Sequence, residues 1–250
     1  MSLTLSVAPT PCDDKTTRQH EKRCPSLAFI TASLTHPARH NIETFIANGF
    51  ATRYDAHISS FMPMLFALEV NGIKAAVGAR CSATHNTHHA LFIEQYLDCP
   101  IEVALEAHEI FAQRRDIVEV GNLFSSASRY TLPLLLSLFF LFSQIGKKYL
   151  VFSATSQVQQ LLQGAGISLT TLAHADVNRL AADRDDWGTY YDTAPQVMAL
   201  SLQEVTHHVM RSSPLRQYYQ QAVGLIASSD SELQLRRALA YPQKGASHVA

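Results

Sequence analysis

The chain has 250 residues, a formal net charge of −1, a charged fraction of 16% and a hydrophobic fraction of 47%. This length allows one α/β domain with extensions. The near-neutral charge argues against a nucleic-acid partner, because surfaces that bind nucleic acid are strongly basic. With so few charges, the polar chemistry falls largely to Ser, Thr, Asn, Gln and His.

Three further classes of protein are disfavoured. The four cysteines, Cys12, Cys24, Cys81 and Cys99, form no C-x-x-C pair, which argues against a zinc site or a disulfide framework. The N-terminus has no basic start and no long apolar core, so we predict no secretory signal and a cytoplasmic location. The most apolar run, 132–145, is shorter than the roughly 20 residues that span a bilayer. We interpret it as a buried helix, with a peripheral membrane contact as the alternative.

The chain order predicts one domain with a tail at each end. Residues 1–25 and 228–250 are polar with little to bury, so we expect both to be disordered. Residues 26–200 form the predicted domain. A capping-box signature at 201–204 then begins a helical extension over 201–227.

Within the domain, predicted strands and helices alternate. Asn71-Gly72 connects the predicted strands 64–70 and 73–82, and this dipeptide is the strongest short hairpin signal. A short strand at 90–93 is expected to pair after the polar loop 84–89. A hairpin followed by βαβ units predicts an α/β (α+β) fold with a mixed sheet. The expected strands are 27–34, 64–70, 73–82, 116–123, 149–154, 168–172 and 197–200, and the expected helices are 37–54, one opened by Pro100, 132–145 and 157–165.

The centre of the chain carries the strongest functional signal. A buried strand over 117–123 holds one carboxylate, Glu119, and leads into a serine-rich loop over 124–129. A helix is expected to open near 131–133. Backbone N–H groups of such a loop, with the first turn of a helix, form a natural seat for an anion. This is the ground plan of an acyltransferase that holds a phosphopantetheine or pyrophosphate tail.

The order of elements resembles the GNAT N-acyltransferase superfamily, and the motifs resemble the thermostable hemolysin family more closely. The resemblance implies a GNAT-like mixed, mostly antiparallel sheet flanked by helices, with a C-terminal helical extension. The matching segments are Phe61–Leu65, Gly78–Arg80, Leu91–Glu102, Ile117–Leu123, Phe152–Thr155, Trp187–Tyr191 and Pro195–Val197.

The family in turn is similar to acyl-homoserine lactone synthases and long-chain N-acyl amino acid synthases. This implies transfer of an acyl chain from acyl-CoA or an acyl-carrier protein phosphopantetheine to an amino acid or other small amine, with no metal. Gly121-Asn122 stands where the lactone synthases have Ser-Arg, so lactone synthesis itself is not expected. Residues 125–129 replace a Gly-rich pyrophosphate loop, which favours a long acyl chain over acetyl-CoA.

Three charged residues are candidates for binding and catalysis. Glu119 resembles the glutamate before the anion loop in those synthases and would act as a general base on the attacking amine. The alternative is a structural ion pair with Arg80. Arg80 would clamp a substrate carboxylate, or simply end its strand in solvent. Glu94 would bind the acceptor amine, or would be an ordinary strand-end residue.

Uncharged candidates surround them. Asn122 would hydrogen-bond the thioester carbonyl or a pantetheine amide, or would cap the strand end. Thr155 would line the cleft between the two parallel strands. Trp187 and Tyr190 would roof an acyl pocket, or would pack as a loop against the sheet.

The donor tail is expected at the serine-rich loop. Leu123, Ser125, Ser126 and Arg129 would meet the pantetheine and its phosphates, and the alternative is a plain helix-capping loop. The histidines at 85, 88 and 89 have metal-like spacing, but no carboxylate lies near them, so no metal site is predicted.

Two rival functions remain open at this point. A membrane-active hemolysin without enzymatic activity would insert its apolar helix 132–145. A GNAT-like binding module would hold acyl carriers without catalysis.

Overall fold

The structure, a computed structural model, describes residues 27–81, 91–180, 187–227 and 229–240. Within them lies a seven-stranded sheet of order β1-β2-β3-β4-β5-β7-β6. Neighbouring strands are antiparallel except β4 and β5, which are parallel. This confirms the predicted mixed, mostly antiparallel sheet. The strands are β1 Ala28–Ala32, β2 Met64–Glu69, β3 Ile73–Cys81, β4 Ile117–Ser125, β5 Tyr149–Ala154, β6 Thr170–His174 and β7 Gln196–Ser201.

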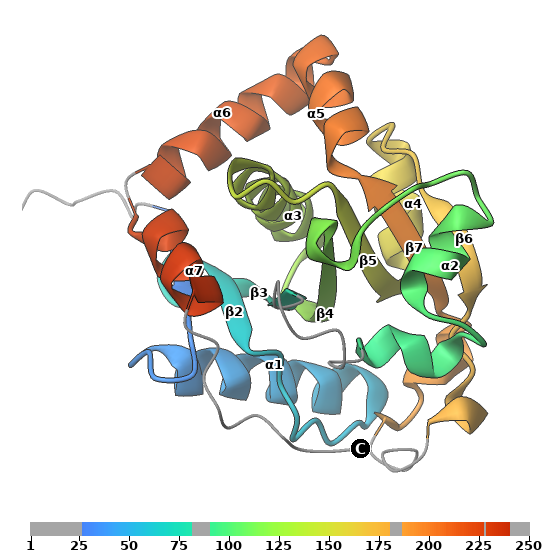
Figure 1. The fold of residues 1–250 in the computed structure, drawn as a ribbon. Coiled ribbons are helices and arrows are strands. Elements are labelled where there is room, and N and C mark those ends of the chain that lie inside the picture. The colour runs from blue at the N-terminus through green and yellow to red at the C-terminus, as the bar shows by residue number, and fades with distance from the viewer. Residues whose placement is uncertain (1–26, 82–90, 181–186, 228, 241–250) are drawn as a thin grey trace, which may run out of the picture.

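Helices cover both faces of the sheet (Figure 1). The apolar side chains of α3, α4 and the C-terminal helices share one core with one face of the strands. The other face is covered by α1 and α2 with two separate cores. The helices are α1 Arg39–Tyr54, α2 Ile101–Glu106, α3 Ser128–Gln144, α4 Ser156–Gly164, α5 Leu202–Arg211, α6 Ser213–Ala227 and α7 Ser231–Ala240.

The β2–β3 hairpin turns where the sequence predicts it. Three residues, 70–72, connect the strands, and two of them have positive φ, Asn71 with 51° and Gly72 with 93°, as the Asn-Gly turn signal predicts. The hairpin places Met64 opposite Ala79 and continues to Glu69 opposite Ile73. The register therefore carries Arg80 to the end of β3, one strand away from Glu119.

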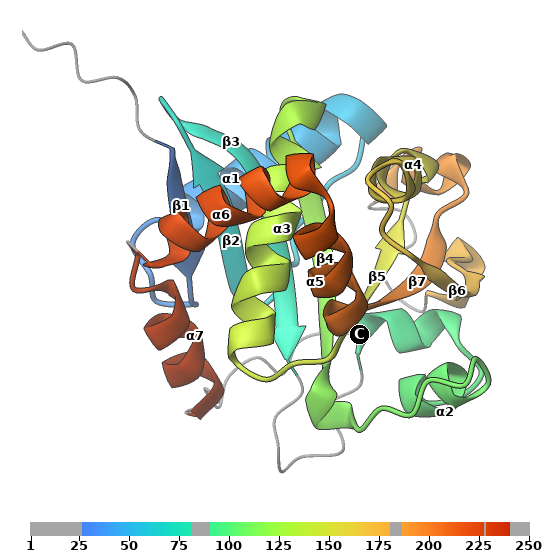
Figure 2. The ribbon, with the colours of Figure 1, turned by 90° about the horizontal axis from the view of Figure 1, so that it is seen from above.

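The apolar run of the sequence forms the middle layer of the molecule. Five α3 side chains, Leu134, Leu136, Leu138, Leu141 and Phe142, are fully buried. Figure 2 shows α6 crossing over α3 on the side away from the sheet. In the described part of the chain, no helix combines the length and the apolarity needed to cross a membrane.

The C-terminal end differs from expectation. Disorder from residue 228 onward is wrong for Ser231–Ala240, which form α7. Leu235 is fully buried in the same core as α3, and this burial stabilises a segment that the polar composition marked as a tail. Segments 1–25 and 241–250 lie outside the described residues.

Candidate active site

Strands β4 and β5 pair over only four residues. Their parallel register runs from Ile117 opposite Tyr149 to Val120 opposite Phe152. Beyond that point β4 pairs only with β3, and β5 pairs only with β7. The two strands therefore part, and we call residues 121–125 of β4 with 153–154 of β5 the splay.

A β-bulge lies on the β4 side of the splay. Gly121 pairs with Gly78 and Phe124 with Ala76, so three steps along β4 oppose two along β3. Asn122, inside the bulge, has φ 52°. Its Oδ1 accepts the Met62 N–H at 2.9 Å, so its side chain ties the bulge to the segment before β2. These contacts fit the strand-end alternative for Asn122.

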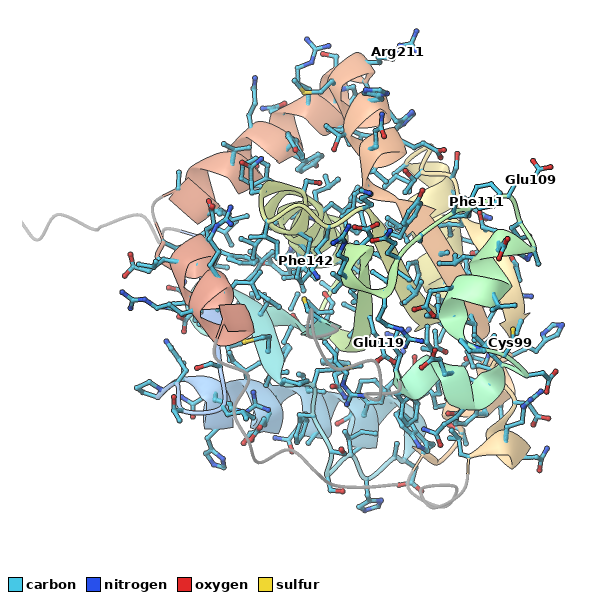
Figure 3. The ribbon with its side chains drawn as sticks, in the orientation of Figure 1. Cys99, Glu109, Phe111, Glu119, Phe142 and Arg211 are labelled. Carbon is cyan, nitrogen blue, oxygen red and sulfur yellow. The ribbon has the colours of Figure 1, made fainter. Side chains whose placement is uncertain are left out.

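Glu119 lies one residue before the last β4–β5 pair and is fully buried. Figure 3 shows it at the middle of the molecule, with Phe142 of α3 in the layer beyond the sheet. Its two carboxylate oxygens accept the N–H groups of Phe92 at 3.0 Å and Ile93 at 2.9 Å. Arg80 Nη1 lies 3.7 Å from Oε2. The structural ion pair that the sequence left open is therefore present.

This arrangement explains an error in the predicted elements. Residues Phe92–Tyr96 form a short 3-10 helix, η1, rather than the expected strand at 90–93. The first-turn N–H groups of a helix have no partner within it, and Glu119 accepts two of them. A buried acceptor 26 residues away along the chain is invisible to local sequence patterns.

The environment of Glu119 favours its protonated form. Burial raises the pKa of the carboxyl above the ordinary 4.5, and the opposing effects of Arg80 and the two backbone N–H groups do not cancel it. Each carboxylate oxygen has a second lone pair beyond the one that its amide occupies. A carboxyl that ionises late and keeps acceptor capacity is suited to general-base chemistry.

Glu94 lies in a different network. Its Oε1 accepts from the Ile101 N–H and from Arg114 Nη2, and its Oε2 accepts from the Leu91 N–H and from Arg114 Nη1, at 2.6–2.9 Å. Burial raises the pKa of Glu94, but these bonds outweigh it and hold the pKa below 4.5. Both oxygens are fully engaged, so the contacts favour a structural role over binding of an amine.

Trp187 and Tyr190 join an aromatic cluster over α1. The Trp187 ring lies 5.5 Å from that of Tyr190 and 6.4 Å from that of Phe50. Burial raises the pKa of Tyr190 to about 12, against an opposing effect of Ser153. Trp187 Nε1 is buried without a hydrogen-bond partner in the described residues. Trp187 and Tyr190 are thus packed against the sheet, and the Trp187 N–H donor has no acceptor among the described residues.

Gly188 explains how this cluster is docked. It has φ 49°, and a Cβ there would lie 2.0 Å from the Tyr54 carbonyl oxygen at the end of α1. The next residue, Thr189, donates its N–H to that same oxygen at 2.7 Å. Only glycine allows this approach.

The predicted phosphate loop is tighter than expected. Helix α3 begins at Ser128 rather than near 131–133, and Ser125 is the last residue of β4. The Ser125 hydroxyl donates to the Ala127 carbonyl at 2.7 Å, and the Ser126 hydroxyl donates to the Lys74 carbonyl at 3.0 Å. Both hydroxyls therefore donate to backbone carbonyls. The Tyr130 N–H in the first turn of α3 donates to the Ala127 carbonyl at 3.0 Å, which leaves the N–H groups that precede Tyr130 in this turn as donors for an anion.

The other predicted binding residues flank this region. The guanidinium of Arg129 lies 4.8 Å from the Tyr130 ring centre. Leu123 packs against the core beneath α3. Thr155 is buried at the residue that precedes α4, directly after β5.

Arg39 and Met62 lie next to Asn122 and were not among the residues predicted from the sequence. Arg39 is buried, and it donates to the carbonyls of Met62 at 3.0 Å and Pro63 at 2.9 Å. Its partners are backbone groups 23 and 24 residues away, and no sequence pattern reports such contacts. In the residues that the structure describes, no group of three or more His, Cys, Asp or Glu could hold a metal ion. The histidines at 85, 88 and 89, where no metal site is predicted, lie outside the described residues.

The fold is therefore a GNAT-like mixed sheet with a buried glutamate beside its splay. A family model described as thermostable hemolysin matches residues 32–206. The chain belongs to the thermostable hemolysin family. No curated protein matches it.

Several solved structures are similar in fold. The acyl-homoserine lactone synthase LasI is 12% identical, with a TM-score of 0.48 over 71% of this chain and 91% of LasI. The CoA-dependent lactone synthase BjaI, with SAM and isopentyl-CoA, is 10% identical, with a TM-score of 0.48 over 85% of this chain and 100% of BjaI. FeeM, an N-acyl amino acid synthase from uncultured soil microbes, is 11% identical, with a TM-score of 0.48 over 76% of this chain and 98% of FeeM.

Proposed function

We propose that this protein is an N-acyltransferase that moves an acyl chain from an acyl thioester to the amine of an amino acid or other small amine. The observation that carries the proposal is the buried Glu119 carboxyl, with its raised pKa, directly beside the splay of β4 and β5. The donor is acyl-CoA or acyl-carrier protein. The resemblance of the motifs to acyl-transferring synthases supports the same activity.

The splay supplies the place for the thioester. Backbone groups of residues 121–125 that face β5 have no strand partner there, and unpaired backbone groups seek polar partners. The amide groups of a pantetheine arm can form hydrogen bonds with these backbone groups. Its phosphate end would lie near the first-turn amides of α3 and Arg129.

The reaction then needs one proton acceptor and one oxyanion site. The amine nitrogen attacks the thioester carbonyl, and Glu119 takes the proton that the nitrogen loses. Backbone N–H groups near Asn122 stabilise the oxyanion of the tetrahedral intermediate. The C–S bond breaks, an amide forms, and the thiolate leaves and gains a proton. Arg80, which is 34% exposed, would bind a carboxylate of the acceptor.

Mass spectrometry of lipid extracts tests this proposal. We would compare bacterial cells that express the wild type, Glu119→Gln and Glu102→Gln. The last is a matched charge removal in the outer part of the Arg114 network. We expect an N-acylated amine in the wild type and in Glu102→Gln that disappears in Glu119→Gln. No product from the wild type would overturn the proposal, and donor binding without turnover would indicate a binding module.

A further inference from the structure

We propose that Met62 sets the size of the acceptor by filling a trough beside Glu119, so that amines with small substituents are accepted and bulky ones are excluded. This inference rests on the proposed acyl transfer and adds a specificity residue to it. Three observations carry it: two glycines beneath Met62, its position relative to Glu119, and the clamp on its backbone.

The trough is made by two facing glycines. Gly78 of β3 and Gly121 of β4 are register partners. A Cβ at Gly78 would lie 2.6 Å from Met62 Cβ, and a Cβ at Gly121 would lie 2.7 Å from Met62 Cε. The Met62 side chain therefore runs across both glycines and takes the space that two ordinary side chains would fill.

The trough continues directly from the charged pair. Arg80 pairs with Glu119 two residues from the glycine pair, after Gly78 on β3 and before Gly121 on β4. Residues two apart in a strand face the same side of the sheet. Gly121, which lies beneath Met62, is therefore about 7 Å from Glu119 along β4, on the side toward the splay. Gly121 remains partly exposed beside the Met62 side chain that covers it.

The backbone of Met62 is held by two hydrogen bonds. Its N–H donates to Asn122 Oδ1 at 2.9 Å, and its carbonyl accepts from Arg39 Nη2 at 3.0 Å. A methionine side chain has three rotatable bonds and adapts to neighbouring shapes. The two hydrogen bonds thus hold the Met62 backbone in place, and its adaptable apolar side chain covers the two glycines.

An acceptor nitrogen held by Glu119 would carry its substituent toward this wall. Removing the Met62 side chain leaves free volume over both glycines. Adding a methyl group at Gly121 has the opposite effect, because it meets the far end of the Met62 side chain. The two changes should alter acceptor size in opposite directions.

The test compares N-acylated products in cells that express the wild type, Met62→Ala, Gly121→Ala and Met64→Ala. Met64 is a matched control, because it is equally buried but belongs to the core on the α3 side of the sheet. We expect Met62→Ala to raise the share of products from acceptors with bulky side chains at least tenfold. Gly121→Ala should lower it, and Met64→Ala should leave it unchanged.

Thermal unfolding of each purified variant separates specificity from folding. If Met62→Ala is folded and gives the wild-type distribution of acceptors, the inference is overturned while the acyltransferase proposal stands. If Met62→Ala is unfolded, the test passes to Gly121→Ala, and an unchanged distribution in that folded variant overturns the inference. If the wild type makes no N-acylated product, both proposals fall.

Discussion

Arg80 and Glu119 are register partners on β3 and β4, and Arg80 Nη1 lies 3.7 Å from Glu119 Oε2. The two side chains differ sharply in exposure: Glu119 is fully buried, whereas 34% of the Arg80 side chain is exposed. The arginine therefore connects a buried carboxyl group with the surface. Its guanidinium favours the ionised carboxyl, while burial opposes it.

The rate of acyl transfer should rise with pH through an ionisation above 4.5, because the native pKa of Glu119 is raised and a base acts in its ionised form. Arg80→Gln should move this ionisation to higher pH, since it removes the effect that lowers the pKa. The measurement is the pH profile of thiol release with donor and amine both present. A profile that is identical in wild type and Arg80→Gln would contradict this account.

The same shift predicts a dependence of stability on pH. A carboxyl with a raised native pKa binds more protons in the folded state, so the free energy of unfolding falls as the pH rises from 4.5 through the native pKa. Glu119→Gln has no such ionisation and should lose this component. Urea unfolding at a series of pH values measures it. An equal slope in both proteins would show that Glu119 ionises normally.

Asn122 should tolerate glycine better than alanine. Both substitutions remove the hydrogen bond to the Met62 N–H, but alanine is strained at φ 52° and glycine is not. We expect Asn122→Ala to lower the free energy of unfolding by about 2–3 kcal/mol and Asn122→Gly by about 1 kcal/mol. Chemical denaturation gives both values, and the reverse order would show that the bulge is not strained.

Glu94 should contribute to the free energy of unfolding at neutral pH, and this contribution should be lost at acid pH. Its native pKa is depressed, so its contribution is present above the ordinary 4.5 and is lost as the pH falls through the native pKa. Glu94→Gln should cost about 2 kcal/mol at pH 7, less than for a fully buried pair because the Arg114 network is partly exposed. Its stability should then decline less than that of the wild type in acid. Equal stability at pH 7 would rule out this role.

The buried position of α3 argues against direct lysis. Phe142 is fully buried, and its ring lies 5.8 Å from that of Phe66 on β2. Phe142→Ala should lower the free energy of unfolding by about 3–5 kcal/mol and loosen α3. If lysis required release of α3, this variant would leak dye-filled liposomes faster than the wild type. We expect no donor-independent leakage from either protein.

The parts of the fold set by local patterns were predictable. Asn71-Gly72 fixed the hairpin, and the apolar run 149–154 gave β5 with its observed bounds. The position of Glu119 in a buried strand beside a helix start was also visible, because a lone carboxylate in an apolar run is costly to bury.

The remainder depended on contacts between distant segments. The 3-10 helix η1 forms over Glu119, and α7 forms because Leu235 enters the core. Met62 becomes part of the site only because two glycines from different strands lie beneath it. Each of these contacts joins residues that are far apart in the chain, and local periodicity carries no record of them.

The packing of α7 and α6 against β1 has a consequence for synthesis on the ribosome. Phe29 of β1, whose ring stacks on Phe66, is made long before α6 and α7, the C-terminal helices that contact β1. The apolar surface of β1 that these two helices cover therefore stays exposed until they are made. We expect ribosome-bound chains that stop before α6 to recruit chaperones, and the full-length chain to release them.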